Sequence, residues 1–255
     1  MKTSNKIFLG LLAAIALNIL TGMVILRTSL GPGSIGNGDT NILGTADIKK
    51  VRLTATDFKQ ISMGDNFQIT LSQGPEEFVE IETDANLIDY FEVKVNKDKT
   101  LYVDVKDGYS LTPSQNVQVH IGFKTLKSIR SHGFCTISAD QQLSFEQLAL
   151  EIHNGSLMKL GVTTHSLAVR ISGASKNEIY GTTDSLQLNV FNSGKFEGPN
   201  FTTKKAKISI NNSGTANLNI IDYLNAATHN NGTLRYSGNP SVHKQATGSG
   251  KIIKN

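Results

Sequence analysis

The stretch Asn192-Ser193-Gly194 recurs as Asn212-Ser213-Gly214 and again, slightly changed, as Asn231-Gly232-Thr233. Related small-residue motifs place glycines at positions 133, 155, 173, 194, 214, 232 and 250, so the intervals between them are 22, 18, 21, 20, 18 and 18 residues. A near-constant period of about 20 residues indicates a solenoid, because a unit of that length cannot bury its apolar face without its neighbours.

Each repeat also carries a short strand. Apolar and polar residues alternate in Leu167–Ile171, Leu186–Val190 and Ala206–Ile210, a pattern typical of half-buried β-strands. Glycine and asparagine tolerate positive φ and therefore suit the corners between strands. The Leu-x-x-Leu-x-Leu pattern of leucine-rich repeats is missing. Residues 131–255 are therefore predicted to form a parallel β-helix, a solenoid with coils of about 20 residues.

The preceding segment, 47–130, is predicted to be rich in β-structure without this repeat. Alternating runs such as Phe67–Leu71, Leu101–Val105 and Val117–Ile121 are separated by turn-forming residues. Only Asn86–Tyr90 suggests a short helical turn, and no long amphipathic helix is visible beyond residue 26. The expected fold class is all-β, with a β-rich N-terminal part running into the solenoid.

The first 26 residues are interpreted as a membrane anchor or a signal peptide. Lys2 and Lys6 precede a mostly apolar stretch, residues 7–26, which as a helix would be long enough to cover the ~30 Å hydrocarbon core of a membrane. Residues 27–46 are rich in Gly and turn formers and are predicted to be a flexible tether. We therefore expect a cell-envelope protein, membrane-anchored through residues 7–26, with an exported C-terminal ectodomain, periplasmic or extracellular.

Several linear motifs occur in a recognisable order. Phe58-Lys59-Gln60-Ile61 and Leu71-Ser72-Gln73-Gly74 are followed by Val79–Leu87, and the chain ends with Tyr236–Val242 and Gly248–Ile252. This order resembles the putative auto-transporter adhesin, head GIN domain family (DUF2807) of Bacteroidetes over roughly residues 54–253. The resemblance implies a right-handed β-helix, an envelope location and an adhesin role. Many members carry a signal or a lipid anchor, whereas this chain has no lipid-acceptor cysteine after its apolar stretch.

The residue types argue against most catalytic and metal-dependent chemistry. The only cysteine, Cys135, cannot form an internal disulfide or a cysteine-based zinc site and is expected to be a small buried residue. His132 and His153 lie about one coil apart, so their imidazoles could stack. The pair is interpreted either as part of a metal site or as two corner histidines facing solvent. Ser172-Gly173 lacks a Gly-x-Ser-x-Gly frame, and no paired carboxylates recur. The sequence predicts no enzyme, no cofactor, and no catalytic, cofactor-binding or metal residue.

The charge distribution and the Asn and Ser residues at the corners indicate what kinds of partner the chain could bind. Residues 57–107 hold 12 acidic and 5 basic residues, a net of −7, whereas residues 204–255 hold 7 basic and 1 acidic, a net of +6. This asymmetry favours self-association or attraction of an acidic polymer, or it is a solvated surface difference without consequence. Rows of Asn and Ser at the corners could bind sugar hydroxyls or simply satisfy turn backbone groups. The overall charge of +4 gives no case for nucleic acid.

We expect a non-catalytic envelope protein, an adhesin or binding module that presents the solenoid surface to a glycan or protein ligand. One alternative is a periplasmic, membrane-anchored scaffold or regulatory protein. Another is a polysaccharide-active β-helix enzyme, for which the required pair of carboxylates is not evident.

Overall fold

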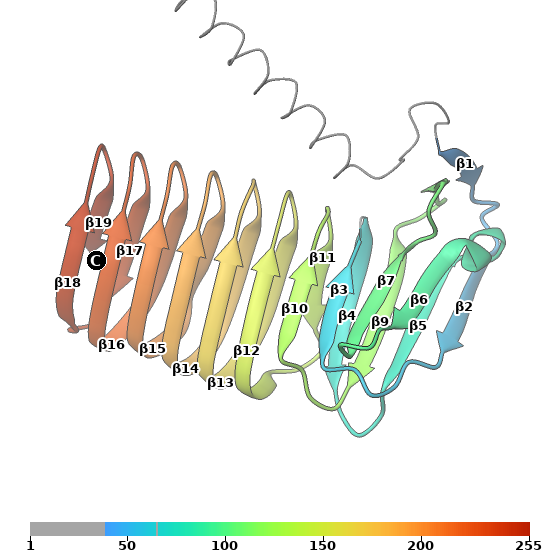
Figure 1. Ribbon diagram of the computed structural model, residues 1–255, viewed down its shortest axis with the longest axis horizontal. Helices are drawn as coiled ribbons and strands as arrows, with labels where there is room; N and C mark the ends of the chain where they lie inside the picture. The colour runs from blue at the N-terminus through green and yellow to red at the C-terminus, as the bar shows by residue number, and fades with distance from the viewer. Residues whose placement is uncertain (1–38, 65) are drawn as a thin grey trace, which may run out of the picture. The chain divides into compact units, whose positions relative to one another are not determined.

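The computed structural model describes residues 39–64 and 66–255, and the folded unit comprises Thr40–Asn255 (Figure 1). Strands make up 66% of the structure, and the 3₁₀-helix η1 (Ala85–Tyr90) coincides with the predicted helical turn. The predicted anchor or signal, residues 1–26, lies outside the described residues. Within the part that is described, no helix is long and apolar enough to span a membrane.

The strands fall into two groups along the chain. The N-terminal group consists of β1 (Thr40–Leu43), β2 (Ile48–Leu53), β3 (Gln60–Met63), β4 (Phe67–Gln73), β5 (Phe78–Asp84), β6 (Phe91–Val95), β7 (Thr100–Val105), β8 (Tyr109–Thr112) and β9 (Val117–Phe123). The solenoid group consists of β10 (Ser128–Ser131), β11 (Thr136–Ala139), β12 (Leu143–Ile152), β13 (Leu157–Ile171), β14 (Lys176–Val190), β15 (Lys195–Ile210), β16 (Thr215–Thr228), β17 (Thr233–Ser237), β18 (Ser241–Ala246) and β19 (Lys251–Lys254).

The prediction of a β-solenoid is confirmed. It has about 7 turns, with coils about 19 residues apart. Each of the long strands β13, β14 and β15 bends to follow most of one coil and pairs in parallel with the next (Figure 1). The predicted strands Leu167–Ile171, Leu186–Val190 and Ala206–Ile210 form the second half of these long strands, and they stack in register.

Matching inward positions of successive coils form the core. Leu167 pairs with Leu186, Leu186 with Ala206, and Ala206 with Leu224, and all four are at most 3% exposed. Since paired residues of a parallel ladder point to the same side of the sheet, each coil buries its apolar residues against those of its neighbours. The core is therefore a set of aliphatic columns along the solenoid.

Left-handed residues turn the chain at one corner in six successive coils. Asn154, Asn192, Asn212 and Asn230 have φ between 57° and 62°, and Gly173 and Gly248 occupy the same corner position in their own coils. Asparagine and glycine are the residues that adopt this conformation most readily. The structural period, read from these residues, is more even than the one read from the glycines. The reason is that glycine occupies different positions of the corner in different coils.

The N-terminal part continues both sheets of the solenoid. β4 pairs in parallel with β11 and β9, after which β5 and β2 are antiparallel. On the other face β3 pairs in parallel with β10 and β7, after which β6 is antiparallel. A parallel solenoid thus ends in antiparallel edge strands, and one core cluster runs through both parts.

The folded unit begins earlier than the sequence indicated. β1 lies inside the segment predicted to be a tether, 27–46, and pairs in parallel with β8. Asp84 is fully buried beside it and accepts hydrogen bonds from the backbone of Ala46 and Ser114. Residues 40–46 therefore belong to the folded unit. Their sequence carries no periodic signal, because they pair with residues far along the chain and not with a neighbouring repeat.

Candidate functional site

A second corner of the solenoid is shaped by buried threonines. Thr164, Thr183 and Thr203 are at most 6% exposed, and each hydroxyl donates a hydrogen bond to the carbonyl two residues later, at 3.1, 3.1 and 2.9 Å. These local bonds satisfy the bent backbone at the corner. They also turn the intervening residue outward, so that each coil presents one side chain at this edge.

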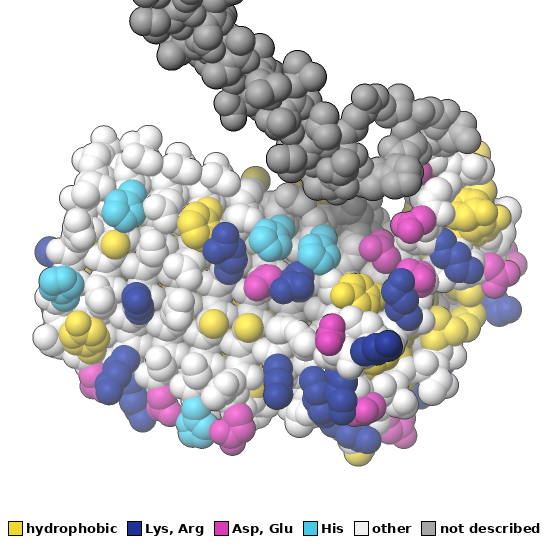
Figure 2. Space-filling model, in the orientation of Figure 1, with side chains coloured by type: hydrophobic (Ala, Val, Ile, Leu, Met, Phe, Trp, Pro, Cys, Tyr) yellow, Lys and Arg dark blue, Asp and Glu magenta, His cyan; other side chains and the backbone are white. Residues whose placement is uncertain are grey.

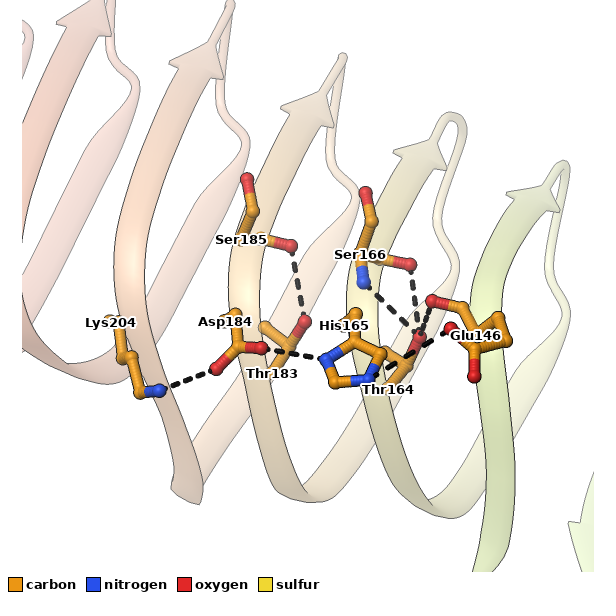
Figure 3. A network of polar contacts seen from close by, with 8 residues as sticks. All are labelled: Glu146, Thr164, His165, Ser166, Thr183, Asp184, Ser185 and Lys204. Atoms are coloured by element: carbon orange, nitrogen blue, oxygen red, sulfur yellow. Dashed lines mark hydrogen bonds and ion pairs between the residues drawn. The ribbon is translucent and has the colours of Figure 1, made fainter.

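The outward residues form a corner ladder: Glu146, His165, Asp184 and Lys204, one from each of β12 to β15 (Figure 3). His165 Nδ1 lies 2.8 Å from Asp184 Oδ2, and Lys204 Nζ lies 2.7 Å from Asp184 Oδ1. On the other side, His165 Nε2 lies 3.9 Å from Glu146 Oε2. Acidic and basic groups therefore alternate along the edge when His165 is protonated.

These contacts shift the ionisation of the ladder. The hydrogen bond with Asp184 raises the pKa of His165, and the charge of Glu146 adds to the effect. Hydrogen bonds from His165 and Lys204 lower the pKa of Asp184, and the bond with Asp184 raises the pKa of Lys204. Because all of these side chains are well exposed, solvent and salt screen the interactions.

A groove of about 1280 Å³ runs along this corner. It is lined by the corner ladder and by Thr163, Thr182 and Thr202, which stand next to the buried threonines on successive coils. Figure 2 shows charged and histidine side chains following one another along the lower edge of the solenoid, with Lys and Arg gathered toward one end. We call this feature the corner groove.

Three lysines line one end of the corner groove: Lys99, Lys59 and Lys127. They come from distant parts of the chain but precede three neighbouring strands, because the backbone N–H of Lys59 bonds to Lys99 O at 2.8 Å and that of Lys127 to Lys59 O at 2.7 Å. We call these residues the lysine ladder. Neighbouring strands are about 4.8 Å apart, and like charges directly opposite each other destabilise a sheet.

Only part of this charge is neutralised by the protein. Lys99 Nζ lies 3.0 Å from Asp57 Oδ1, and Lys59 Nζ donates to Thr125 Oγ1 at 2.9 Å. Neither Lys59 nor Lys127 forms an ion pair within the described ranges. The lysine ladder can therefore accept an anionic group.

The two histidines singled out in the sequence do stack. The rings of His132 and His153 are 6.4 Å apart and inclined by 7°. His132 Nε2 contacts Ser62 Oγ at 2.9 Å, and His153 Nδ1 contacts Ser172 Oγ at 2.7 Å. Burial is the main cause that lowers the pKa of His153. No group of three or more His, Cys, Asp or Glu side chains suited to a metal ion occurs among the described residues.

Cys135 and the corner asparagines also have partners within the fold. Cys135 is 1% exposed, and its thiol donates to the carbonyl of Gly64. The corner asparagines form a chain of amides: Asn212 Nδ2 donates to Asn192 Oδ1 at 3.0 Å, and Asn230 Nδ2 donates to Asn212 Oδ1 at 2.9 Å. These bonds run along the solenoid between coils, so much of the amide capacity is used within the fold.

The sequence did not single out either ladder. The corner ladder has no shared residue type, and its members become neighbours only when the coil register is known. One signal in the sequence could have revealed the corner ladder: a Thr directly precedes each of His165, Asp184 and Lys204. The lysine ladder gave only a weak local signal. Lys59, Lys99 and Lys127 are each followed by a polar and then an aliphatic residue, but Lys124 shares this pattern and lies outside the ladder.

Comparison with known proteins gives one family and several similar folds. The family model described as putative auto-transporter adhesin, head GIN domain, matches residues 57–240. A solved putative adhesin from Bacteroides fragilis is 20% identical with a TM-score of 0.76, covering 84% of this chain and 99% of its own. A putative lipid binding protein from Parabacteroides distasonis is 20% identical with a TM-score of 0.71, covering 85% and 100%. A putative adhesin from the same organism is 19% identical with a TM-score of 0.73, covering 84% and 100%. No curated protein matches the chain.

Proposed function

This chain belongs to the putative auto-transporter adhesin, head GIN domain family, and on that premise we propose that it is a non-catalytic, adhesin-type binding protein of the cell envelope. We further propose that the corner groove holds its ligand, an extended acidic polysaccharide. The observation that carries this assignment is the lysine ladder. Lys59 and Lys127, which have no acidic partner among the described residues, repel each other and Lys99 in the free protein, and an anion lying across the three would relieve this repulsion.

The rest of the corner groove suits a chain-like ligand. Thr163, Thr182 and Thr202 repeat along it at the spacing of the coils, about 4.8 Å, and hydroxyl groups can both donate to and accept from sugar hydroxyls. The corner ladder supplies alternating charges along the same edge. A polymer with acidic groups at intervals could therefore contact the lysine ladder and several coils together.

The carboxylates of the corner ladder argue for binding rather than hydrolysis. A glycosidase needs one carboxylic acid with a raised pKa to protonate the leaving group. The hydrogen bonds from His165 and Lys204 lower the pKa of Asp184 instead. Asp184 is therefore held as a carboxylate and is poorly suited to the acid role.

Binding of acidic polysaccharides by the full-length protein in detergent micelles tests the ligand assignment. The variant Lys59→Gln/Lys99→Gln/Lys127→Gln should bind a uronic-acid polysaccharide about tenfold or more weakly than the native protein. The matched control Lys195→Gln/Lys207→Gln/Lys251→Gln removes equal charge from exposed positions outside the corner groove and should bind nearly as well as the native protein.

Three results would contradict the assignment. Equal losses in the two triple variants would point to nonspecific attraction. Binding of neutral and acidic polysaccharides alike would remove the role of the lysine ladder. Binding to vesicles of anionic lipid but to no polysaccharide would place the protein with lipid-binding members of the fold.

The location is tested separately from the ligand. An adhesin must reach the outer surface, whereas a periplasmic scaffold or regulatory protein stays behind the outer membrane. Protease should digest the ectodomain in intact cells if it is an adhesin, and mass spectrometry of the N-terminus shows whether residues 1–26 are removed. Protection until the outer membrane is opened, with residues 1–26 retained, would favour the periplasmic alternative.

A further inference from the structure

The coil formed by β18 and β19 differs from the preceding coils in what it directs toward the core. β18 pairs in register with β16, which places Val242 opposite Leu224 and Lys244 opposite Ala226. β19 pairs in register with β17, which places Ile252 opposite Leu234 and Lys254 opposite Tyr236. Opposite residues of a parallel ladder point to the same side of the sheet.

Both lysines therefore stand on core columns. Ala226 and Tyr236 are 1% and 5% exposed, so their side of the sheet is the inner side. Lys244 and Lys254 occupy the next level of the same columns but are exposed, and Lys254 Nζ donates to Asn239 Oδ1 at 2.7 Å. In the preceding coils the residues of these columns are apolar, as with Val169, Leu188 and Ile208 below Ala226.

The end of the solenoid otherwise has the features of a site for strand addition. β18 and β19 lie at the end of the molecule opposite β2 (Figure 1). Their outer backbone groups face away from β16 and β17, and such edges are templates for pairing with another chain. Val242 is 37% exposed above the fully buried Leu224, so apolar surface is accessible as well.

We infer that Lys244 and Lys254 act as a cap that prevents any further β-strand, including the end coil of a second copy, from stacking on the C-terminal coil. A stacked strand would enclose two ammonium groups between coils, and burial of an unpaired charge is strongly unfavourable. Two copies meeting end to end would also bring four lysines together. Edge strands in natural proteins use lysine for the same purpose.

The cap limits the self-association that was one interpretation of the charge asymmetry. The net charge of +6 over residues 204–255 includes the two cap lysines. The basic end can attract an acidic surface, but it cannot extend the β-sheet of the solenoid while both ammonium groups are present. Self-association of this chain must therefore use a surface other than the coil of β18 and β19.

Sedimentation velocity of the full-length protein in one detergent tests the inference, because any contribution of residues 7–26 is then common to all samples. The variant Lys244→Val/Lys254→Val should associate at least about tenfold more tightly than the native protein. The charge-matched control Lys207→Val/Lys251→Val places the same residues at outward, exposed positions and should sediment like the native protein.

A second variant covers the case in which the valine pair aggregates before folding. Lys244→Thr/Lys254→Thr is neutral and keeps strand-forming residues, and it should also associate more than the control. The inference is overturned if both cap variants remain as dispersed as the native protein. It is equally overturned if the outward control associates to the same extent, since loss of charge alone would then be the cause.

Discussion

Asp84 and Ser114 are joined by two hydrogen bonds: the backbone N–H of Ser114 donates to Asp84 Oδ2 at 2.8 Å, and Ser114 Oγ donates to Oδ1 at 2.7 Å. Asp84 also accepts from the backbone of Ala46, and its side chain is fully buried. The carboxylate therefore ties together β5, the segment after β1 and the segment after β8. It fixes the place where the chain enters the folded unit.

Replacing Asp84 should destabilise the protein, and the loss of stability should depend on pH. Burial raises the pKa of Asp84, but the hydrogen bonds from Ser114 and Ala46 outweigh it, and the net pKa lies below the ordinary value. The stabilisation is thus present above the unfolded pKa of about 3.9 and is lost as the pH falls through the folded pKa. Urea midpoints of the native protein and Asp84→Ala should differ clearly at neutral pH, and the gap should narrow in acid. An equal gap at both pH values would contradict this role.

The corner at Asn212 should accept glycine but not alanine. Asn212 has φ of 59°, donates to Asn192 and accepts from Asn230. Asn212→Ala loses both amide bonds and puts a less tolerant residue in the left-handed region, so it should cost about 1–2 kcal/mol. Asn212→Gly can adopt the left-handed conformation without strain, as Gly173 does at the same corner. It should therefore be clearly more stable than the alanine variant in denaturant titrations. A glycine variant no better than alanine would show that the amide bonds dominate.

Gly181 should be among the least replaceable glycines of the solenoid. Its φ is 112°, and an added Cβ would lie 2.2 Å from the backbone oxygen of Val162. Gly181→Ala should therefore cost about 2 kcal/mol or more, from strain and overlap together. At Gly74 an added Cβ meets nothing within 4 Å, so Gly74→Ala should change stability by about 0.5 kcal/mol or less. Thermal unfolding of the pair checks this contrast, and similar losses would contradict it.

The corner ladder should respond to mild acid. The hydrogen bond with Asp184 raises the pKa of His165, so its stabilising contact is fully present below the unfolded pKa of about 6.5 and is lost as the pH rises through the folded value. NMR titration should give His165 a midpoint above the ordinary value, and Asp184→Asn should lower it. If His165 and the lysine ladder share one anionic ligand, affinity should increase as His165 becomes protonated. An unchanged midpoint in Asp184→Asn would reject the pairing.

Much of the solenoid could be predicted from the sequence because its periodicity is local. Alternation in Leu186–Val190 and its neighbours marks strands that stack on copies of themselves. The alignment of the corners between coils was harder to predict from the sequence. Asn192 and Gly173 both adopt the left-handed conformation at the corner, whereas Gly194 lies two residues after Asn192 in the same turn. The end of the tether was misjudged because β1 depends on β8, far along the chain.

The candidate site was less accessible to sequence reasoning. His132 and His153 belong to one corner motif, so their stacking could be anticipated. Lys59, Lys99 and Lys127 come together only through the pairing of β3 with both β7 and β10. Such a site follows from the register of strands, and the register of the N-terminal strands has no periodic signal.

The coils differ in length, and the structure shows where the extra residues go. Register shifts fall between Glu178 and Gly181, between Gly198 and Thr202, and between Thr203 and Lys205. All of these shifts lie at or beside the corner that carries Thr182 and Thr202. Regular strand register resumes at Lys205. Insertions and deletions can therefore accumulate at the rim of the corner groove without disturbing the aliphatic columns. The edge of the solenoid that carries the corner groove can therefore vary among related proteins while the core stays the same.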